Sequence, residues 1–184
     1  HREMWTPQTI IRVSNPAPYN THFKDYGLGF VLNDACGYLE VSHTGSLAGM
    51  VTQITMIPEL RLGIIVLTNQ QCGEAFYSIT NTILDSYFGI KGIDRVKEYN
   101  DSYLKDMADA KSVTDKVWSE IEAQQKNAAS KPDLSAYAGT YTDNWFGDVS
   151  VERNDDGLRF VSKRSAKICG DLIYYKGNTF IARW

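Results

Sequence analysis

One long, charged, helix-prone stretch divides this chain into two regions that are rich in short β-like runs. Over residues 94–129 charges are frequent and apolar residues recur at steps of three and four, which predicts an amphipathic helix. The apolar residues are Val96, Tyr99, Tyr103, Met107, Ala110, Val113, Val117 and Ile121. Ser130-Lys131-Pro132-Asp133 predicts its end. We therefore expect three parts: residues 1–92, a helical connector over residues 93–132, and residues 133–184.

The first part mixes four β-like runs with glycines and turn formers, which predicts a mostly antiparallel sheet. The runs are YGLGFVL, GYLEVSHTG, MVTQITMI and LGIIVLTN. MVTQITMI alternates as a strand with unlike faces does, whereas the unbroken LGIIVL is typical of a strand covered on both sides. A helix should follow, with Phe76, Ile79, Ile83 and Tyr87 on one stripe and Gly89 at its end. The fold class is α+β, an antiparallel sheet packed by helices.

The last part returns to short β-like runs and predicts a small meander or barrel-like domain. Its runs are YAGTYTD, DVSVER, LRFVSK, LIYYKG and NTFIARW. The apparent strand that contains Trp184 has no closing partner, so we expect an incomplete sheet. An exposed sheet edge of this kind favours pairing between chains, and we expect a homodimer.

Charge and composition exclude several classes of protein. The net charge is -3, from 19 basic and 22 acidic residues, which gives no broad positive field for nucleic acid. The longest apolar run, LGIIVL, is far shorter than the roughly 20 residues that span a bilayer. The three cysteines form no CxxC pair, and the three histidines have no short ligand spacing. We therefore expect no nucleic-acid partner, no transmembrane segment, no metal and no cofactor.

The stretch VSHTGSLAGM, which starts at Val41, ends a predicted strand with a chemically coherent group. Regular alternation puts His43 on the face of Val41, so its side chain should face inward, while Thr44 points the other way. Thr44 offers a hydroxyl, Gly45 lets a ligand approach without a Cβ in the way, and Ser46 offers a backbone N–H on an open strand edge. Together they predict a cradle for an oxyanion or a carboxylate. A hydrogen-bonded core histidine is the ordinary alternative for His43.

Several elements in this order resemble the C-terminal part of the serine β-lactamase and penicillin-binding-protein superfamily. They are the run YGLGF, the strand ending in HTGS, the LAGM after it, and two strands ending in LTNQ before a helix. The resemblance covers roughly the first 90 residues and is closest to the class C type, which includes esterases and peptidases. The tail from Tyr137 resembles the small lipocalin-like domain appended to many of these hydrolases.

The resemblance implies a role for each residue of the motif. His43 takes the place of the lysine of a Lys-Thr-Gly triplet, which polarises the site and helps proton movement. Thr44 would hydrogen-bond the carboxylate or carbonyl of a small acyl or peptide-like substrate. Gly45 would give clearance, and the Ser46 N–H would form half of the oxyanion hole. The predicted site is thus catalytic His43, Thr44 and Gly45, with Ser46 binding the substrate.

The same resemblance requires a Ser-x-x-Lys nucleophile and a Tyr-x-Asn, both before the HTGS strand. No Tyr-x-Asn occurs, and the one Ser-x-x-Lys, Ser102-Tyr103-Leu104-Lys105, lies after that strand in the charged helix. We interpret it as helix surface, because nothing nearby in the sequence could activate the serine. We therefore expect this chain to be the back half of a hydrolase whose N-terminal half carries the nucleophile. The resemblance implies a periplasmic or extracellular bacterial parent, with any signal peptide before His1.

Two other functions stay open at the level of sequence. A cysteine hydrolase would pair Cys36 or Cys72 with His43, but neither cysteine begins a helix in a way that lowers a thiol pKa. The stronger rival is a non-catalytic ligand-binding or assembly module built on the C-terminal β-domain. Its many aromatic residues could line a pocket, although such residues more often fill a small core.

Overall fold

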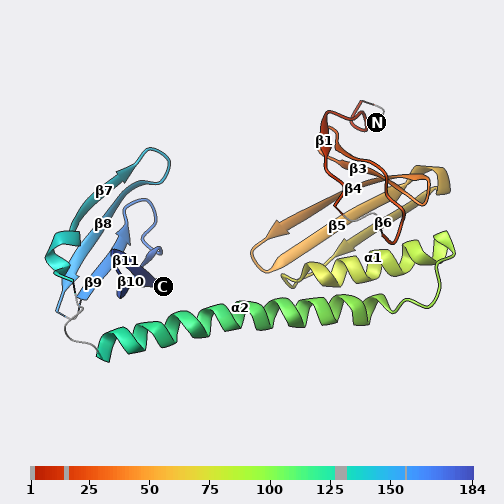
Figure 1. The fold of residues 1–184 in the computed structure, drawn as a ribbon. Coiled ribbons are helices and arrows are strands. Elements are labelled where there is room, and N and C mark those ends of the chain that lie inside the picture. The colour runs from red at the N-terminus through yellow and green to blue at the C-terminus, as the bar shows by residue number, and fades with distance from the viewer. Residues whose placement is uncertain (1–2, 15–16, 127–131, 156) are drawn as a thin grey trace. The chain divides into compact units, whose positions relative to one another are not determined.

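The chain forms two compact units, His1–Asp106 and Met107–Trp184. The computed structural model describes residues 3–14, 17–126, 132–155 and 157–184. Each unit has one antiparallel sheet, and the helices are α1 and α2 (Figure 1). This arrangement confirms the predicted α+β class.

The sheet of the first unit follows the order of the chain, β1-β2-β3-β4-β5-β6, and all its pairs are antiparallel. Its strands are β1 (Thr9–Ile11), β2 (Lys24–Tyr26), β3 (Val31–Ala35), β4 (Tyr38–Leu47), β5 (Met50–Ile57) and β6 (Leu62–Leu67), with the short 3-10 helix η1 (Pro58–Leu60) between the last two. Sequential order means that short turns make most connections, as the closely spaced β-like runs predict.

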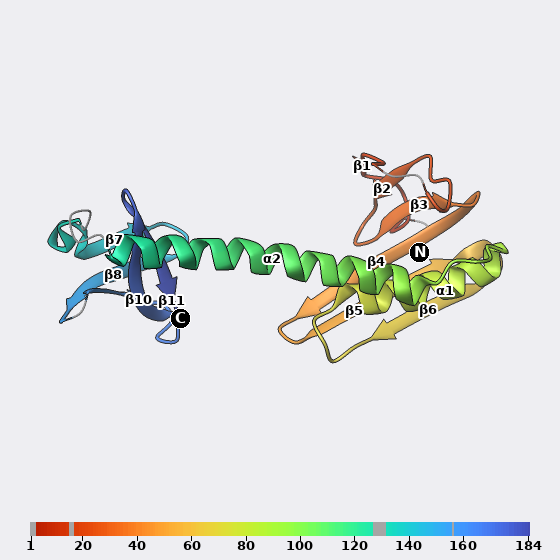
Figure 2. The same ribbon diagram turned by 60° about the horizontal axis from the view of Figure 1, so that its bottom comes forward.

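Helix α1 (Gly73–Phe88) covers one face of this sheet, as Figures 1 and 2 both show. Its buried apolar residues are Phe76 and Leu84, whereas Ile79 is 47% exposed and Tyr87 is 55% exposed. The predicted stripe was therefore only partly right, because the face that packs on the sheet consists of residues spaced four apart, Phe76, Thr80 and Leu84. Gly89 ends the helix as predicted. Its φ of 71° lies in the left-handed region, which is unfavourable for residues that have a Cβ atom.

The two faces of the sheet differ in their cover. On β5 the residues Val51, Gln53, Thr55 and Ile57 are buried, and the Thr80 hydroxyl of α1 donates to the Gln53 carbonyl oxygen at 2.7 Å. Alternation in MVTQITMI is thus confirmed. In β6 the side chains of Ile64 and Val66 are buried, but those of Ile65 and Leu67 are 67% and 74% exposed. The expectation that LGIIVL is covered on both sides is wrong, since in the described structure only the face with Ile64 and Val66 is covered.

Helix α2 (Arg95–Lys126) belongs to both units, because the division falls between Asp106 and Met107. Its last turns pack on the second sheet, where Ile121 is 2% exposed and the Tyr175 hydroxyl donates to Glu120. The helix ends before Pro132, and Ser130 and Lys131 of the predicted break lie outside the described residues. Within the described part of the chain, no helix has both the length and the apolar character needed to cross a membrane.

A buried network joins the start of α2 to the end of α1. The Arg95 guanidinium donates to both oxygens of Asp85, at 2.7 and 3.0 Å, and the Tyr19 hydroxyl donates to Asp85 at 3.0 Å. The Asp85 hydrogen bonds raise the pKa of Arg95, while burial and the Asp85 charge raise that of Tyr19. The carboxylate thus accepts three hydrogen bonds, two of them from a guanidinium, and three segments of the first unit meet there.

The sheet of the second unit is a meander in the order β11-β10-β9-β8-β7. Its strands are β7 (Gly139–Asp143), β8 (Gly147–Asn154), β9 (Gly157–Ser162), β10 (Cys169–Lys176) and β11 (Thr179–Arg183), preceded by the 3-10 helix η3 (Leu134–Tyr137). The predicted meander is confirmed, but it does not form a barrel. In the described residues β7 and β11 are not paired with each other, so both are edges.

Breaking the network around Asp85 should unfold the first unit more easily. We expect Arg95→Ala to lower its free energy of unfolding by about 3–5 kcal/mol, because the Asp85 charge stays buried without its partner. Urea denaturation followed by circular dichroism measures the loss. Lys97→Ala is the matched control, because it breaks an exposed pair with Asp101 and should change little. Equal midpoints for the two variants would contradict this role of the network.

Candidate functional site

The segment His43–Leu47 is an open strand edge. Strand β3 pairs with β4 only as far as the pair Val31 and Ser42, whereas β5 continues alongside to Leu47. On the β3 side, none of the described strands pairs with β4 beyond Ser42. Free backbone groups on such an edge can hydrogen-bond an extended ligand, as one more strand would.

The backbone N–H of Ser46 points to this open edge. Its partner Val51 bonds with Thr68 on the other side, since the Val51 carbonyl accepts from the Thr68 N–H at 3.1 Å and the Val51 N–H donates to the Thr68 hydroxyl at 3.4 Å. Ser46 and Val51 are therefore a non-hydrogen-bonded pair of the β4–β5 ladder. In such a pair the N–H groups point away from the partner strand. Ser46 thus offers a donor where the sequence predicts half of an oxyanion hole.

His43 is exposed and held by two hydrogen bonds. Its Nδ1 lies 2.6 Å from the carbonyl oxygen of Thr44, and its Nε2 lies 2.9 Å from the hydroxyl of Tyr26. A carbonyl only accepts, so Nδ1 carries a proton, and in the neutral ring Nε2 is then the atom that accepts from Tyr26. The expectation of an inward-facing histidine is wrong, because the cover over Val41 does not reach His43. An ordered, accessible imidazole can exchange a proton with a bound molecule.

Tyr26 is the site residue that sequence reasoning missed. It lies at the end of β2, while His43 lies two strands away on β4, and the rings meet edge to face with centroids 6.0 Å apart. The contact forms because β3, the strand between them, begins at Val31 and leaves the space beyond it open. The only signal was the position of Tyr26 in the run YGLGF, which carried part of the resemblance.

Thr44 and Gly45 complete the group on opposite faces of β4. A Cβ on Gly45 would lie 2.8 Å from the hydroxyl oxygen of Thr52, so this position requires glycine unless Thr52 moves. The space beside Gly45, which the sequence analysis assigns to a ligand, is thus occupied on that face by the Thr52 side chain of β5. Thr44 is exposed and pairs with Gln53 in the ladder. The structure brings His43, Thr44, Gly45 and Ser46 onto one edge.

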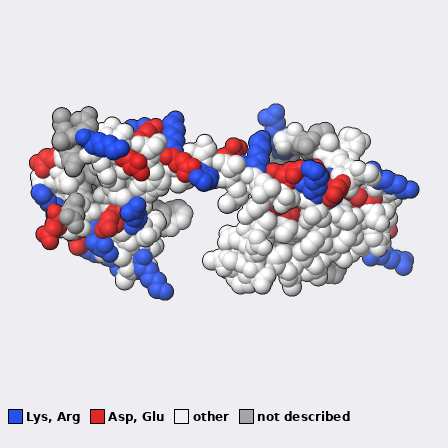
Figure 3. Space-filling model, turned by 90° about the horizontal axis from the view of Figure 1, so that it is seen from below, with Lys and Arg blue, Asp and Glu red and all other residues white. Residues whose placement is uncertain are grey.

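Beyond the buried Val41, the sheet face that carries His43 and Gly45 is apolar and uncovered. Exposed side chains on it include Leu47 at 71%, Met50 at 46%, Ile65 at 67% and Leu67 at 74%. No Asp, Glu, Lys or Arg occurs in residues 41–58 or 62–73. Figure 3 views the opposite side of this sheet, the side of α1, and the right-hand unit has a wide area without charged side chains there as well. Exposed apolar surface of this extent is typical of an interaction site.

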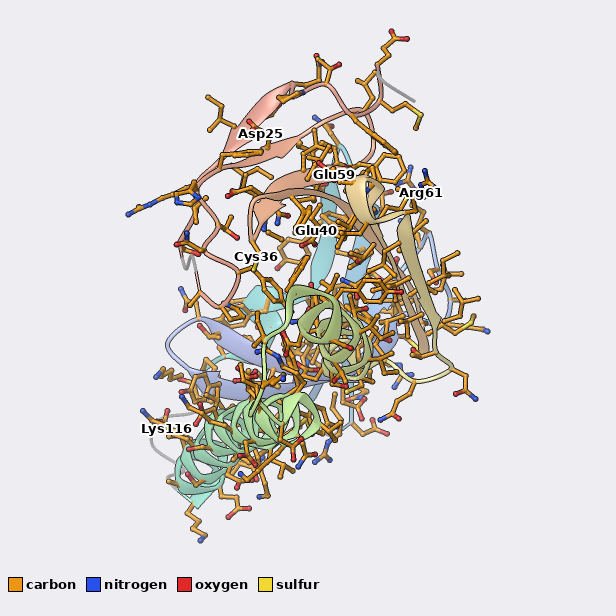
Figure 4. All side chains as sticks on the ribbon, turned by 90° about the vertical axis from the view of Figure 1, so that its right-hand side faces the viewer. Asp25, Cys36, Glu40, Glu59, Arg61 and Lys116 are labelled. Atoms are coloured by element: carbon orange, nitrogen blue, oxygen red, sulfur yellow. The ribbon has the colours of Figure 1, made fainter. Side chains whose placement is uncertain are left out.

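Two carboxyl groups near β4, those of the half-buried Glu40 and the exposed Glu59, serve the fold. Glu40 lies on the opposite face from His43, and Figure 4 labels it with Glu59, whose carboxylate accepts from the Leu39 N–H at 3.2 Å. Burial raises the pKa of Glu40, although Asn33 donates to it at 3.3 Å. Neither carboxyl group hydrogen-bonds to His43 in the described structure.

Asp34 clamps the loop before β2 onto β3. Its carboxylate accepts from the backbone N–H groups of His22 and Phe23, at 2.7 and 2.9 Å, and lies 2.9 Å from the His22 ring. Burial alone would raise the pKa of Asp34, but these hydrogen bonds lower it to about 2. The pair of Asp34 and His22 therefore has a structural explanation and is not needed for chemistry at His43.

The other candidate reactive side chains make no contact with the His43 edge in the described structure. Ser102 and Lys105 are exposed on α2. Cys36 is a free thiol whose pKa is raised by partial desolvation and by the Asp85 charge, which disfavours the thiolate. Cys72 is the N-cap residue of α1, so the expectation that neither cysteine lies at a helix N-terminus is wrong, but its thiol donates to Glu74 and not to a histidine. Among the described residues, no three His, Cys, Asp or Glu side chains are grouped to hold a metal ion.

Comparisons with known proteins inform only the second unit and the end of α2. A family model described as a domain of unknown function, DUF3471, matches residues 123–184. That match spans the last turn of α2, η3 and the whole β7–β11 meander. No match was found among curated proteins or among solved structures. The meander is thus similar to a recognised domain family whose function is not defined, and the His43 edge lies outside that match.

Proposed function

We propose that this chain is the C-terminal part of a serine hydrolase related to β-lactamases and penicillin-binding proteins. It would supply one wall of an active site that cleaves an ester, a peptide or a β-lactam through an acyl-serine. The nucleophilic serine would come from the N-terminal half of the same protein. The single observation that carries this proposal is the open edge at His43–Ser46, where a side-chain base and a backbone N–H donor lie three residues apart.

Each residue of the edge suits one step of acyl transfer. The Ser46 N–H would donate to the oxyanion that forms when the serine attacks a carbonyl. The Thr44 hydroxyl would bind the carbonyl or carboxylate of the substrate. His43, whose Nε2 accepts from the Tyr26 hydroxyl at 2.9 Å, would polarise the site and pass a proton through that contact. Gly45 keeps β4 and β5 close enough to hold this geometry.

The uncovered face of the first sheet supports the proposal that an N-terminal half of the protein packs against it. Leu47, Ile65 and Leu67 are each more than two-thirds exposed on the face that carries His43. Burying one such side chain is worth about 1.5–3 kcal/mol, so a covering layer would stabilise the sheet considerably. A layer placed there would also be next to the His43 edge. The proposed N-terminal half meets both needs, because the nucleophile must come within hydrogen-bonding reach of that edge.

A second candidate function rests on the second unit. A cavity of about 760 Å³ lies between the end of α2 and the meander. Its lining combines apolar Leu158, Leu172 and Ile173 with charged Arg153 and Asp171. A pocket of this kind would suit a non-catalytic module that binds a small ligand. The two candidates differ in a direct way, because a purely binding protein has no serine that reacts with an acylating probe.

Further features of the parent follow from the resemblance. Its partner would be a small acyl or peptide-like substrate, and it would act in the periplasm or outside the cell. We also propose a homodimer through the unpaired edge of β11, because a free edge can pair with a second copy. Light scattering on this chain should then give twice the mass of 20.7 kDa. A monomer at every concentration would contradict the dimer without affecting the hydrolase proposal.

The nucleophile itself gives the sharpest test. We expect this chain to give only background signals with a fluorophosphonate probe, a p-nitrophenyl ester and a chromogenic β-lactam. Without an activated serine it cannot form an acyl-enzyme. The parent protein with its N-terminal half should be labelled at one serine, and mass spectrometry identifies the site. Labelling of Ser102 in this chain, or no labelling of the parent, would contradict the proposal.

His43 provides the second test, in the parent protein. We expect His43→Ala to lower kcat/KM by about 10²-fold or more and to leave the melting temperature nearly unchanged, because an exposed polarising group is lost. The control is His22→Gln, which keeps a donor for Asp34 and should retain activity. If His43→Ala unfolds the protein at a lower temperature but keeps its rate, His43 is structural and the proposed role is wrong.

A further inference from the structure

The turn between β7 and β8 exposes two large aromatic side chains side by side. Trp145 is 80% exposed and Phe146 is 68% exposed. Their rings are stacked, with centroids 5.9 Å apart and planes 11° from parallel. Most tryptophans in folded proteins are largely buried, so a tryptophan and a phenylalanine together at the tip of a hairpin require an explanation.

Hydrogen bonds hold this tip in one conformation. One carboxylate oxygen of Asp143 accepts from the backbone N–H groups of Trp145 and Phe146, both at 2.8 Å. These bonds lower the pKa of Asp143. Gly147 closes the turn with a φ of 75°, and the Arg164 guanidinium donates to the Trp145 carbonyl. The aromatic pair is therefore presented by an ordered turn, and ordering it costs little on binding.

The neighbouring turn adds positive charge and another apolar group. The Lys163 N–H donates to the Asp148 carbonyl at 3.1 Å, which places the β9–β10 turn beside the aromatic tip. That turn carries Lys163, Arg164 and Lys167, and its Ile168 is 48% exposed. Lys163 pairs with Asp148 at 3.6 Å. In the described structure neither Arg164 nor Lys167 has a carboxylate partner, so both charges are available.

We propose that this end of the meander binds the surface of an anionic phospholipid bilayer. Tryptophan favours the interface between headgroups and acyl chains, where its ring lies in an apolar layer and its N–H can reach polar groups. Phe146 and Ile168 would enter the same layer. Arg164 and Lys167 would lie against anionic headgroups, which attract basic residues near the membrane surface. The aromatic tip and the two cations without a carboxylate partner, Arg164 and Lys167, together fit this partner better than either does alone.

The geometry disfavours a carbohydrate as the partner. A sugar ring commonly stacks on an open aromatic face, but Trp145 and Phe146 cover part of each other by stacking together. A compact stacked pair at the end of a hairpin is a wedge that can enter a fluid interface. Unpaired cations beside it do not help an uncharged glycan to bind, whereas they attract an anionic surface. This inference is independent of the proposed hydrolase function, because it concerns only the second unit.

Co-sedimentation of the full 184-residue chain with vesicles tests the proposal. We expect binding to vesicles of equimolar phosphatidylcholine and phosphatidylglycerol, and weaker binding to phosphatidylcholine alone or at high salt. The double variant Trp145→Ser with Phe146→Ser should lower the partition coefficient by about tenfold or more, because it removes the inserted apolar area. Lys167→Glu should lower it for the anionic vesicles.

Matched controls separate this tip from other exposed groups. Tyr87→Ser removes an aromatic side chain that is 55% exposed on α1, and Lys105→Glu changes an exposed lysine on α2. Both should bind vesicles as the unaltered chain does, and circular dichroism checks that all variants are folded. No binding to anionic vesicles, or equal binding by the double variant, would overturn the proposal. Trp145-dependent pelleting with insoluble peptidoglycan, without vesicle binding, would overturn it in favour of a glycan.

Discussion

The carboxylate of Asp85 holds the first unit together, and the geometry of the candidate site depends on it. A buried charge is tolerated only when it is paired and hydrogen-bonded, and here Arg95 and Tyr19 supply three donors. Tyr19 in turn accepts from the Cys36 N–H through its carbonyl, at 2.6 Å, at the turn between β3 and β4. The network therefore links α1 and α2 to the hairpin whose second strand carries His43. Its contacts are all distant from the open edge, so it acts on the site only by placing β4.

Local periodicity predicts most of the elements, because it depends on neighbouring residues alone. The alternation in MVTQITMI, the helix that Gly89 ends and the meander of hairpins are all found in the structure. The contacts that join distant segments were not predictable. Nothing in the sequence pairs Arg95 with Asp85. The stripe expected on α1 missed Leu84, because the helix turns the side that steps by four residues from Phe76 toward the sheet, and the sequence offers Ile79 and Ile83 as equally apolar choices.

The same distinction applies to the candidate site. His43, Thr44, Gly45 and Ser46 are consecutive, so a strand ending in HTGS brings them to one edge without long-range information. The accessibility of His43 and its contact with Tyr26 depend on where β3 begins, which is a property of the whole sheet. The sequence predicted an inward-facing histidine, because alternation on a strand says which residues share a face and not how far the cover on that face extends.

The strand β6 has more apolar residues than the described fold buries. An unbroken run such as LGIIVL is typical of a strand covered on both sides, yet α1 packs only on Ile64 and Val66. The side chains of Ile65 and Leu67 are 67% and 74% exposed, so most of their apolar surface meets water in the described structure. Their surface also lacks charges over two neighbouring strands, unlike the tip at Trp145, where cations flank a small aromatic wedge. A flat uncharged face requires a broad packed partner such as a layer of helices, whereas a small basic tip suits a charged fluid surface. The two exposed apolar regions therefore require partners of different kinds: a packed protein layer for the sheet face and a charged fluid surface for the tip at Trp145.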